Sequence, residues 1–263
     1  MLLCLDIGNT QIHGGVFDGD ALRCQFRRST QPQGSSDELG IFLTAVLPVL
    51  GIAPRDIDRV AICSVVPAAL HSARNASLRY FQREPFVLQA GVKTGLKVRY
   101  VNPQEVGADR IAGSIAAIHR RPGSDLIVVD CGTATTFDVI TAGADYLGGV
   151  ILPGLGMSAD ALASHTAKLP RVEIARPGGV LGRTTVESIQ SGLYHGHVGA
   201  IRHVVAELRR EALGSAPTQV IGTGGLARLF ERERLFDEIV PELVLWGLRQ
   251  AELLNREAGA TRK

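Results

Sequence analysis

The segment "CLDIGNTQ" places a carboxylate at the end of a short apolar run. Asp6 ends this run, and Gly8, Asn9 and Thr10 follow almost at once. Glycine lets a backbone approach a ligand closely, and the N–H groups and hydroxyls of such a turn suit phosphate oxygens. A carboxylate beside them can hold Mg²⁺ through water. The alternative is that aspartate and glycine simply end a buried strand.

A second segment, "VVDCGTATTFDV", repeats this arrangement nearly half the chain later. Asp130 follows an apolar run and precedes Gly132 and Thr133. We interpret this repeated pattern as an internal duplication that gives two related lobes. The alternative is a chance match, because only four positions agree. A third glycine turn, Thr223–Gly225, follows a predicted strand. Three such turns favour an adenine nucleotide as the ligand.

Other nucleotide-binding signatures are absent or incomplete. The sequence contains no G-x-x-x-x-G-K-[ST] motif, which excludes a Walker-type loop. "GLGMSA" at 154–159 imitates the dinucleotide fingerprint, but Pro153 precedes it and Glu173 does not clearly end a strand. We interpret this stretch as a glycine-rich connection into a helix.

The stretch "NPQEVGADR" at 102–110 contains another carboxylate with chemical potential. Asn102, Pro103 and Glu105 are typical of a capped helix start, so Asp109 is expected within about two turns of a helix N-terminus. The helix dipole favours the ionised form of a carboxyl there. One interpretation is a surface ion pair with Arg110. The other is a base that accepts a proton from a substrate hydroxyl, beside a cation that holds an anionic substrate group.

Hydrophobic periodicity predicts the elements that position these residues. The expected strands cover residues 2–7, 11–17, 21–26, 59–66, 125–129 and 219–222. A helix is expected over 39–50, with Pro48 bending or ending it, and another over 186–208. The second helix contains Gly192, Gly196 and Gly199, which favour close approach to another element or subunit. Packing within one subunit is the alternative.

Composition limits the class of protein. The 263 residues are 45% hydrophobic and 21% charged, which is typical of a globular chain. A net charge of +2 does not support a nucleic-acid partner, and no apolar stretch approaches the roughly 18–20 residues that span a membrane. The first residues lack a basic leader, so we expect no secretory signal. We interpret the four cysteines as reduced residues of a cytoplasmic protein: Cys4, Cys24, Cys63 and Cys131.

Stretches along nearly the whole chain carry a family resemblance. They are "LDIGNT" at 5–10, "SVVP" at 64–67, "NPQEVGADR" at 102–110, "DCGTATTFD" at 130–138, "GGVILPG" at 148–154, "TAKLP" at 166–170 and "TGG" at 223–225. In this order the chain resembles the type III pantothenate kinases, within the acetate and sugar kinase, Hsp70 and actin superfamily. The resemblance implies an α/β fold of two ribonuclease-H-like (actin-like ATPase) lobes, each a mixed sheet with flanking helices, with a cleft between them. We expect the N-terminal lobe over 1–118 and the C-terminal lobe over 119–263.

The resemblance also implies the reaction and its partners. The expected activity is ATP-dependent phosphorylation of pantothenate to 4'-phosphopantothenate, the first step of coenzyme A biosynthesis. ATP would act with Mg²⁺, and a monovalent cation, K⁺ or NH₄⁺, would also be needed. A cytoplasmic homodimer is expected, with no nucleic-acid or membrane partner.

The motifs that match the family imply roles for individual residues of this chain. The resemblance implies that Asp109 is the general base, that Asp6 binds Mg²⁺ through water, and that Asp130 binds K⁺ or NH₄⁺ at a subunit interface. The implied ATP-binding residues are Asp6, Ile7, Gly8, Asn9, Thr10, Gln11, Ile12, His13 and Thr133. The implied pantothenate-binding residues are Tyr100, Gly107, Ala108, Asp109, Arg110 and Thr185. His13 stands where the family often has lysine, which leaves a charged phosphate contact from that side chain open, and the adjacent Thr184 leaves the Thr185 assignment open by one residue.

Two other functions are alternatives to pantothenate phosphorylation. The first is another small-molecule kinase of the superfamily, acting on a sugar, acetate or polyphosphate; the "GADR" segment favours pantothenate over these. The second is a non-catalytic regulator that retains the fold. Such a regulator is expected to have lost Asp6, Asp109 or Asp130, and all three are present.

Overall fold

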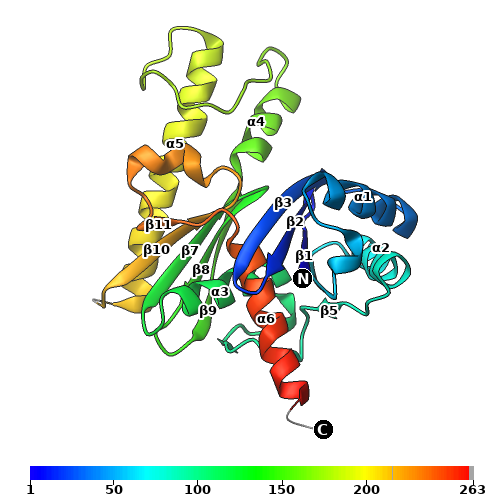
Figure 1. The fold of residues 1–263 in the computed structure, drawn as a ribbon. Coiled ribbons are helices and arrows are strands. Elements are labelled where there is room, and N and C mark those ends of the chain that lie inside the picture. The colour runs from blue at the N-terminus through cyan, green and yellow to red at the C-terminus, as the bar shows by residue number, and fades with distance from the viewer. Residues whose placement is uncertain (215, 261–263) are drawn as a thin grey trace. The chain divides into compact units, whose positions relative to one another are not determined.

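The computed structural model describes residues 1–214 and 216–260, and residue contacts divide the chain into two compact units (Figure 1). Unit 1 contains Met1–Leu96, Val101–His119 and the last helix. Unit 2 contains Lys97–Tyr100 and Arg120–Glu242. The change of unit after His119 lies one residue from the predicted lobe boundary. The last helix differs from the prediction, because it makes its contacts in unit 1. The lobes as independent domains stay a prediction.

The sheet of unit 1 is mixed, with strand order β3-β2-β1-β4-β5. Its central strand β1 is antiparallel to β2 and parallel to β4. The strands are β1 (Leu2–Ile7), β2 (Gln11–Asp18), β3 (Ala21–Ser29), β4 (Arg59–Ser64) and β5 (Phe86–Val87). The first four coincide with predicted strands to within three residues at each end.

The helices of unit 1 cover both faces of its sheet. They are α1 (Ser36–Val49), α2 (Pro67–Ala76), α3 (Ala108–Arg120) and α6 (Leu243–Ala260), with short turns η1 (Pro54–Asp56), η2 (Ser77–Phe81) and η3 (Pro103–Glu105). Leu3, Leu5 and Ile7 of β1 join one core with α1 and α2. Side chains alternate along a strand, so Leu2, Cys4 and Asp6 point to the opposite face.

Helix α6 packs against β1 and β4 on that opposite face. Its buried side includes Leu245 and Leu248, and its Glu252 binds Arg59 of β4, with 2.9 Å between Oε2 and Nη1. This apolar side and this ion pair explain why α6 belongs with unit 1. Periodicity along the chain does not predict this packing, because the contacting strand β1 lies at the opposite end of the chain from α6.

The sheet of unit 2 has strand order β11-β10-β7-β8-β9-β6. The strands are β6 (Lys97–Val98), β7 (Asp125–Cys131), β8 (Ala134–Ile140), β9 (Asp145–Pro153), β10 (Thr218–Thr223) and β11 (Glu238–Ile239). The helical elements are α4 (Leu155–Ser164), α5 (Thr185–Leu208), η4 (Arg209–Leu213) and η5 (Ala227–Glu233). Helix α5 packs on a core that includes Ile127 and Val129 of β7 and Phe230 of η5.

The two sheets repeat one topology. In unit 2, β7 is antiparallel to β8 and parallel to β10, as β1 is to β2 and β4 in unit 1. The residues pair equivalently, since Asp6 lies opposite His13 and Asp130 lies opposite Thr136. This repeat supports the interpretation of an internal duplication. The predicted α/β class, with two mixed sheets and flanking helices, is confirmed.

Three details of the fold bear on the sequence predictions. Helix α1 ends at Val49, one residue after Pro48, and the segment after the third glycine turn forms a 3₁₀ helix, η5. All four cysteines are free of disulfides. Within the described residues, no helix combines the length and apolar character needed to cross a membrane.

Candidate functional site

The first glycine turn connects β1 to β2 with both of its ends anchored in the core. Ile7 and Ile12 are 0% and 5% exposed, whereas Asn9, Thr10 and Gln11 are exposed. The Gly8 N–H donates to the Gln11 carbonyl at 3.0 Å, which closes the turn. The turn therefore presents exposed polar residues at the end of the strand that carries Asp6. Any contact that Ile7 or Ile12 makes with a nucleotide must come from the backbone.

His13 is buried, although its position was predicted to lie in the nucleotide site. Its side chain is 7% exposed, and its Nε2 lies 3.0 Å from Gln25 Oε1 on the neighbouring strand. This environment orients the ring toward β3 and gives it a polar partner there.

Asp6 has an unusual electrostatic environment for a carboxylate. Burial and the nearby charge of Asp109 raise its pKa to about 7, against the lowering effects of a Cys63 hydrogen bond and of Arg27. Cys63 lies beside Asp6 in the parallel register of β4, and its Sγ donates to Asp6 Oδ1 at 3.2 Å. The influence of Asp109 shows that the structure brings two of the predicted carboxylates together within unit 1.

Asp109 lies in the first turn of α3, as the sequence predicted, although the expected cap belongs to a separate turn. Asn102 caps η3 by accepting from the Gln104 N–H, and α3 begins only at Ala108. The Asp109 Oδ1 accepts a hydrogen bond from the Arg110 N–H at 2.8 Å. Burial raises the pKa of Asp109, while this bond and the Arg110 guanidinium oppose the rise. Asp109 is therefore a carboxylate with increased basicity at a fixed position.

Gly107 allows the Asp109 side chain to fold back over the start of α3. A Cβ at position 107 would overlap Asp109 Oδ1 and lie 3.5 Å from Val65 Cγ1. Any larger residue at position 107 would displace the Asp109 carboxylate. The "GADR" segment therefore needs glycine at its first position for steric reasons.

In unit 2, two further glycine turns contact Asp130. Gly224 has a φ of +85°, and a Cβ there would overlap Asp130 Oδ1; a Cβ on Gly132 would lie 3.1 Å from the same oxygen. The Leu226 N–H donates to the Cys131 carbonyl at 3.1 Å, which holds the third glycine turn against the second. The sequence predicted these turns separately, and the structure brings both to one carboxylate.

The second glycine turn is supported from α5. Thr133 is exposed on the turn, and Thr135 on β8 is buried, with its Oγ1 2.8 Å from Nε2 of His197. Burial lowers the pKa of His197, and its ring stacks on Phe230 at a centroid distance of 5.6 Å. His197 thus links β8 to α5.

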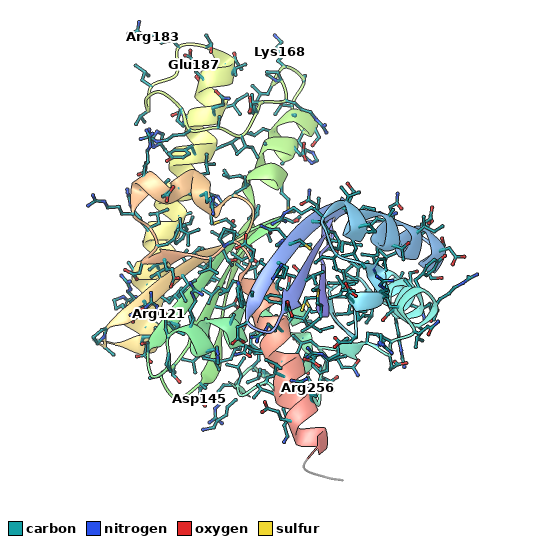
Figure 2. The ribbon with its side chains drawn as sticks, in the orientation of Figure 1. Arg121, Asp145, Lys168, Arg183, Glu187 and Arg256 are labelled. Atoms are coloured by element: carbon teal, nitrogen blue, oxygen red, sulfur yellow. The ribbon has the colours of Figure 1, made fainter. Side chains whose placement is uncertain are left out.

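The predicted substrate residues of unit 2 lie on two separate segments. Tyr100 follows β6, and its ring packs against Gly148, where a Cβ would lie 3.3 Å from Tyr100 Cε2. Thr184 caps α5 by accepting from the Glu187 N–H at 3.2 Å, and Thr185 is the first residue of the helix. Figure 2 shows Arg183 and Glu187 at this end of α5, and the Arg183 N–H donates to Glu187 Oε2 at 2.7 Å.

Comparison with known proteins identifies the family. Residues 2–207 match the family model for type III pantothenate kinases. A type III pantothenate kinase of Legionella pneumophila (strain Corby) is 52% identical over 255 residues, covering 97% of this chain and 99% of the relative. One from Elusimicrobium minutum is 43% identical over 256 residues, covering 97% and 99%.

The chain belongs to the type III pantothenate kinase family. The predicted family and its kinase activity on pantothenate are thereby confirmed. Among solved structures, the activator of 2-hydroxyisocaproyl-CoA dehydratase from Clostridium difficile, determined with bound ADPNP, matches with a TM-score of 0.54 at 13% identity. The match covers 99% of this chain and 96% of that one, and it supports the actin-like fold.

Two residues that contact the predicted site of this pantothenate kinase were not found from the sequence. Cys63 is one, because a cysteine near the end of a predicted strand does not reveal the hydrogen bond to Asp6. Thr30 is another, since it lies outside every motif yet bonds twice to the first glycine turn. The parallel pairing of residues 2–7 with 59–64 places Cys63 beside Asp6, and the sequence contains no signal for that register.

Proposed function

We propose that this pantothenate kinase uses Asp109 as the general base for transfer of the ATP γ-phosphoryl group to the pantothenate hydroxyl. The oxygen of that hydroxyl forms a bond to the γ-phosphorus, and the bond between this phosphorus and the β,γ-bridging oxygen breaks. The hydroxyl proton passes to the Asp109 carboxylate. The observation that carries the proposal is the fixed, basic position of Asp109 next to Asp6.

Phosphoryl transfer has a loose transition state, so alignment and charge compensation supply most of the catalysis. Asp109 therefore need not deprotonate the alcohol in advance. It orients the hydroxyl and accepts the proton as the new bond forms. A buried carboxylate suits this task, because burial raises the pKa of Asp109 and strengthens it as a proton acceptor.

The first glycine turn is the proposed site of the ATP phosphates in unit 1. Its exposed residues Asn9, Thr10 and Gln11 offer the polar groups, and Asp6 is proposed to hold Mg²⁺ through water. No group of three or more His, Cys, Asp or Glu side chains in the described part of the chain forms a metal site. A single carboxylate nevertheless fits Mg²⁺, which keeps several waters and binds substrate phosphates. When bound, Mg²⁺ supplies positive charge to the phosphates and to the paired carboxylates.

Apart from Arg110, the remaining proposed contacts come from residues of unit 2. Thr133 is proposed to bind nucleotide phosphate and Tyr100 to contact pantothenate. Thr185 is a better candidate for pantothenate than Thr184, because the Thr184 hydroxyl already caps α5. Arg110 is proposed to bind the pantothenate carboxylate from unit 1.

Turnover by variants tests the role of Asp109. Removal of a general base costs about 10²–10⁴-fold in rate, so Asp109→Asn should lose turnover by that order. Asp37→Asn is a matched control, because Asp37 is an exposed carboxylate of unit 1 bound to Arg79 at 2.8 Å. A coupled assay of ATP consumption, with and without pantothenate, gives the rates. Near-normal turnover of a folded Asp109→Asn variant would reject the proposed role.

The same assay distinguishes pantothenate from other acceptors. ATP consumption should depend on pantothenate and should stay at background with a sugar or with acetate. Activity on either of these, without activity on pantothenate, would favour another kinase of the superfamily.

A monovalent cation at Asp130 is the second part of the proposal. Two glycine turns approach the Asp130 carboxylate closely, which leaves room beside this oxygen ligand for a small cation. Activity should be higher in K⁺ or NH₄⁺ than in Na⁺, and Asp130→Asn should remove this difference. A parent protein that is equally active in K⁺, NH₄⁺ and Na⁺ would contradict the cation site.

A homodimer in the cytoplasm completes the proposal. Space around Gly192, Gly196 and Gly199 of α5 is open, since a Cβ placed there meets no atom within 4 Å in the described residues, apart from its chain neighbours and the backbone of its own helix. This face is therefore free for close approach by a second copy. Light scattering should give the mass of a dimer for the parent and a monomer for Gly196→Arg. The four free cysteines are compatible with the reducing cytoplasm.

A further inference from the structure

Thr30 makes two hydrogen bonds to the backbone of the first glycine turn. It follows the last residue of β3, and its Oγ1 donates to the Gly8 carbonyl at 2.7 Å. Its backbone N–H donates to the Thr10 carbonyl at 2.9 Å. One residue thus holds two of the carbonyl oxygens in a turn of four residues.

These two bonds decide which groups the turn can present to an anion. A carbonyl oxygen that faces a phosphate repels it, whereas N–H groups and hydroxyls attract it. Within the turn, the Gly8 and Thr10 carbonyls accept from Thr30 and the Gln11 carbonyl accepts from the Gly8 N–H at 3.0 Å. Three carbonyl oxygens are therefore directed to partners inside the protein.

Between its two ends, the turn is held by the two hydrogen bonds from Thr30. The core holds Ile7 and Ile12 at the two ends, while Asn9, Thr10 and Gln11 are exposed. Exposed polar residues next to a glycine have considerable backbone freedom, and ordering them at the time of binding reduces affinity. A threonine that orders them beforehand lowers that cost.

We propose that Thr30 is a positioning residue for nucleotide binding, which acts by holding the Gly8 and Thr10 carbonyls away from the phosphates. The inference rests on the proposed function, because it takes the first glycine turn as a phosphate site. Thr30 itself touches no substrate in this role. It acts through the backbone that it holds.

Three variants separate this role from general stability. Thr30→Val keeps the shape of the side chain and removes the hydroxyl, and Thr30→Ser keeps the hydroxyl. Thr44→Val is the matched control, because the Thr44 Oγ1 also donates to a glycine carbonyl of unit 1, that of Gly40 at 2.9 Å within α1. The readouts are ATP affinity by equilibrium binding without pantothenate, the KM values for ATP and pantothenate, and hydrogen exchange of peptides that contain residues 8–11.

The expected result is selective for the nucleotide. Thr30→Val should weaken ATP binding and raise the KM for ATP by about tenfold. This is the size expected when a side-chain hydrogen bond is lost and its backbone acceptor is left unpaired. The KM for pantothenate should not change, and exchange at residues 8–11 should be faster. Thr30→Ser should behave like the parent, and Thr44→Val should keep the parent ATP affinity.

Several results would overturn the inference. They are an unchanged ATP affinity in Thr30→Val, an equal rise in both KM values, or a Thr30→Ser variant that fails as Thr30→Val does. If Thr30→Val does not fold, Thr30→Ala is tested against Thr30→Ser by the same measurements. Failure of the proposed function is distinguishable, because there the parent itself would not phosphorylate pantothenate, whereas the effect of Thr30→Val on ATP affinity is measured by equilibrium binding without pantothenate.

Discussion

Replacing Asp6 with asparagine should make the unliganded protein more stable at neutral and alkaline pH. Burial and the charge of Asp109 raise the pKa of Asp6 from 3.8 to about 7. Between these values the folded protein keeps a proton that the unfolded chain has released, so the free energy of unfolding falls as pH rises. This stability is complete below the unfolded pKa and is lost as pH rises through about 7. Asparagine has no such proton and avoids the loss.

The magnitude follows from the size of the pKa difference. Each pKa unit represents about 1.4 kcal/mol, so the change from 3.8 to about 7 corresponds to about 4 kcal/mol. About 2 kcal/mol of this falls between roughly pH 5 and pH 7. The amide oxygen of asparagine can still accept the Cys63 hydrogen bond, so the substitution removes the charge with little change in packing. Relative to the parent, Asp6→Asn should therefore gain about 2 kcal/mol as the pH rises across this window.

Trp246 provides a direct assay for unit 1. It is the single tryptophan of the chain, and its ring meets the edge of Phe17 at a centroid distance of 4.9 Å. Urea unfolding followed by tryptophan fluorescence, without Mg²⁺ or nucleotide, gives the free energy at several pH values. Asp58→Asn is a control of opposite sign within unit 1, because the effect of burial is outweighed by the hydrogen bond and charge of the Met1 ammonium together with Arg59, which lower the pKa of Asp58.

The control variant should lose stability above the ordinary aspartate pKa, and the loss should persist at neutral pH. Asp109→Asn should reduce the pH dependence of the parent, since it removes one of the charges that raises the Asp6 pKa. If Asp6→Asn shows the same pH dependence as the parent, then Asp6 is not the group that titrates, and the electrostatic account of this site is wrong.

Three further substitutions test individual contacts. Gly107→Ala should lower kcat by about 10²-fold with little change in stability, because the added methyl displaces the Asp109 carboxylate; steady-state kinetics with a urea titration measures both. Glu252→Gln should destabilise unit 1 by about 1–2 kcal/mol, because it removes the shorter of the two ion pairs of Arg59 and leaves only the contact with Asp58 at 3.5 Å. Trp246 fluorescence reports the change. Gly224→Ala should cost about 1–2 kcal/mol from its positive φ and should also remove any K⁺ activation; unchanged activation by K⁺ would contradict the cation site.

Local sequence patterns predicted the elements that carry chemistry with good accuracy. Apolar runs that end in aspartate located β1 and β7, and the glycine turns after them follow from the residues alone. These features depend on interactions over a few residues, which one sequence records well.

Features that depend on distant pairing were not predictable in this way. Cys63 lies beside Asp6 because β1 and β4 pair in parallel, and the sequence does not state that register. Thr30 reaches the first glycine turn because β3 folds back along β2. Asp109 approaches Asp6 across unit 1 from α3, which family resemblance implied and periodicity did not.

The return of α6 to unit 1 has a consequence for biosynthesis. The face of β1 that carries Leu2, Cys4 and Asp6 receives α6, a helix that the ribosome makes after every strand of unit 2. Until α6 is made, β1 and β4 lack this cover, whereas the strands of unit 2 are already complete. A nascent chain therefore cannot finish the half that contains Asp6 before α6 is translated, and termination before α6 releases an incomplete protein with an exposed sheet for proteases to recognise.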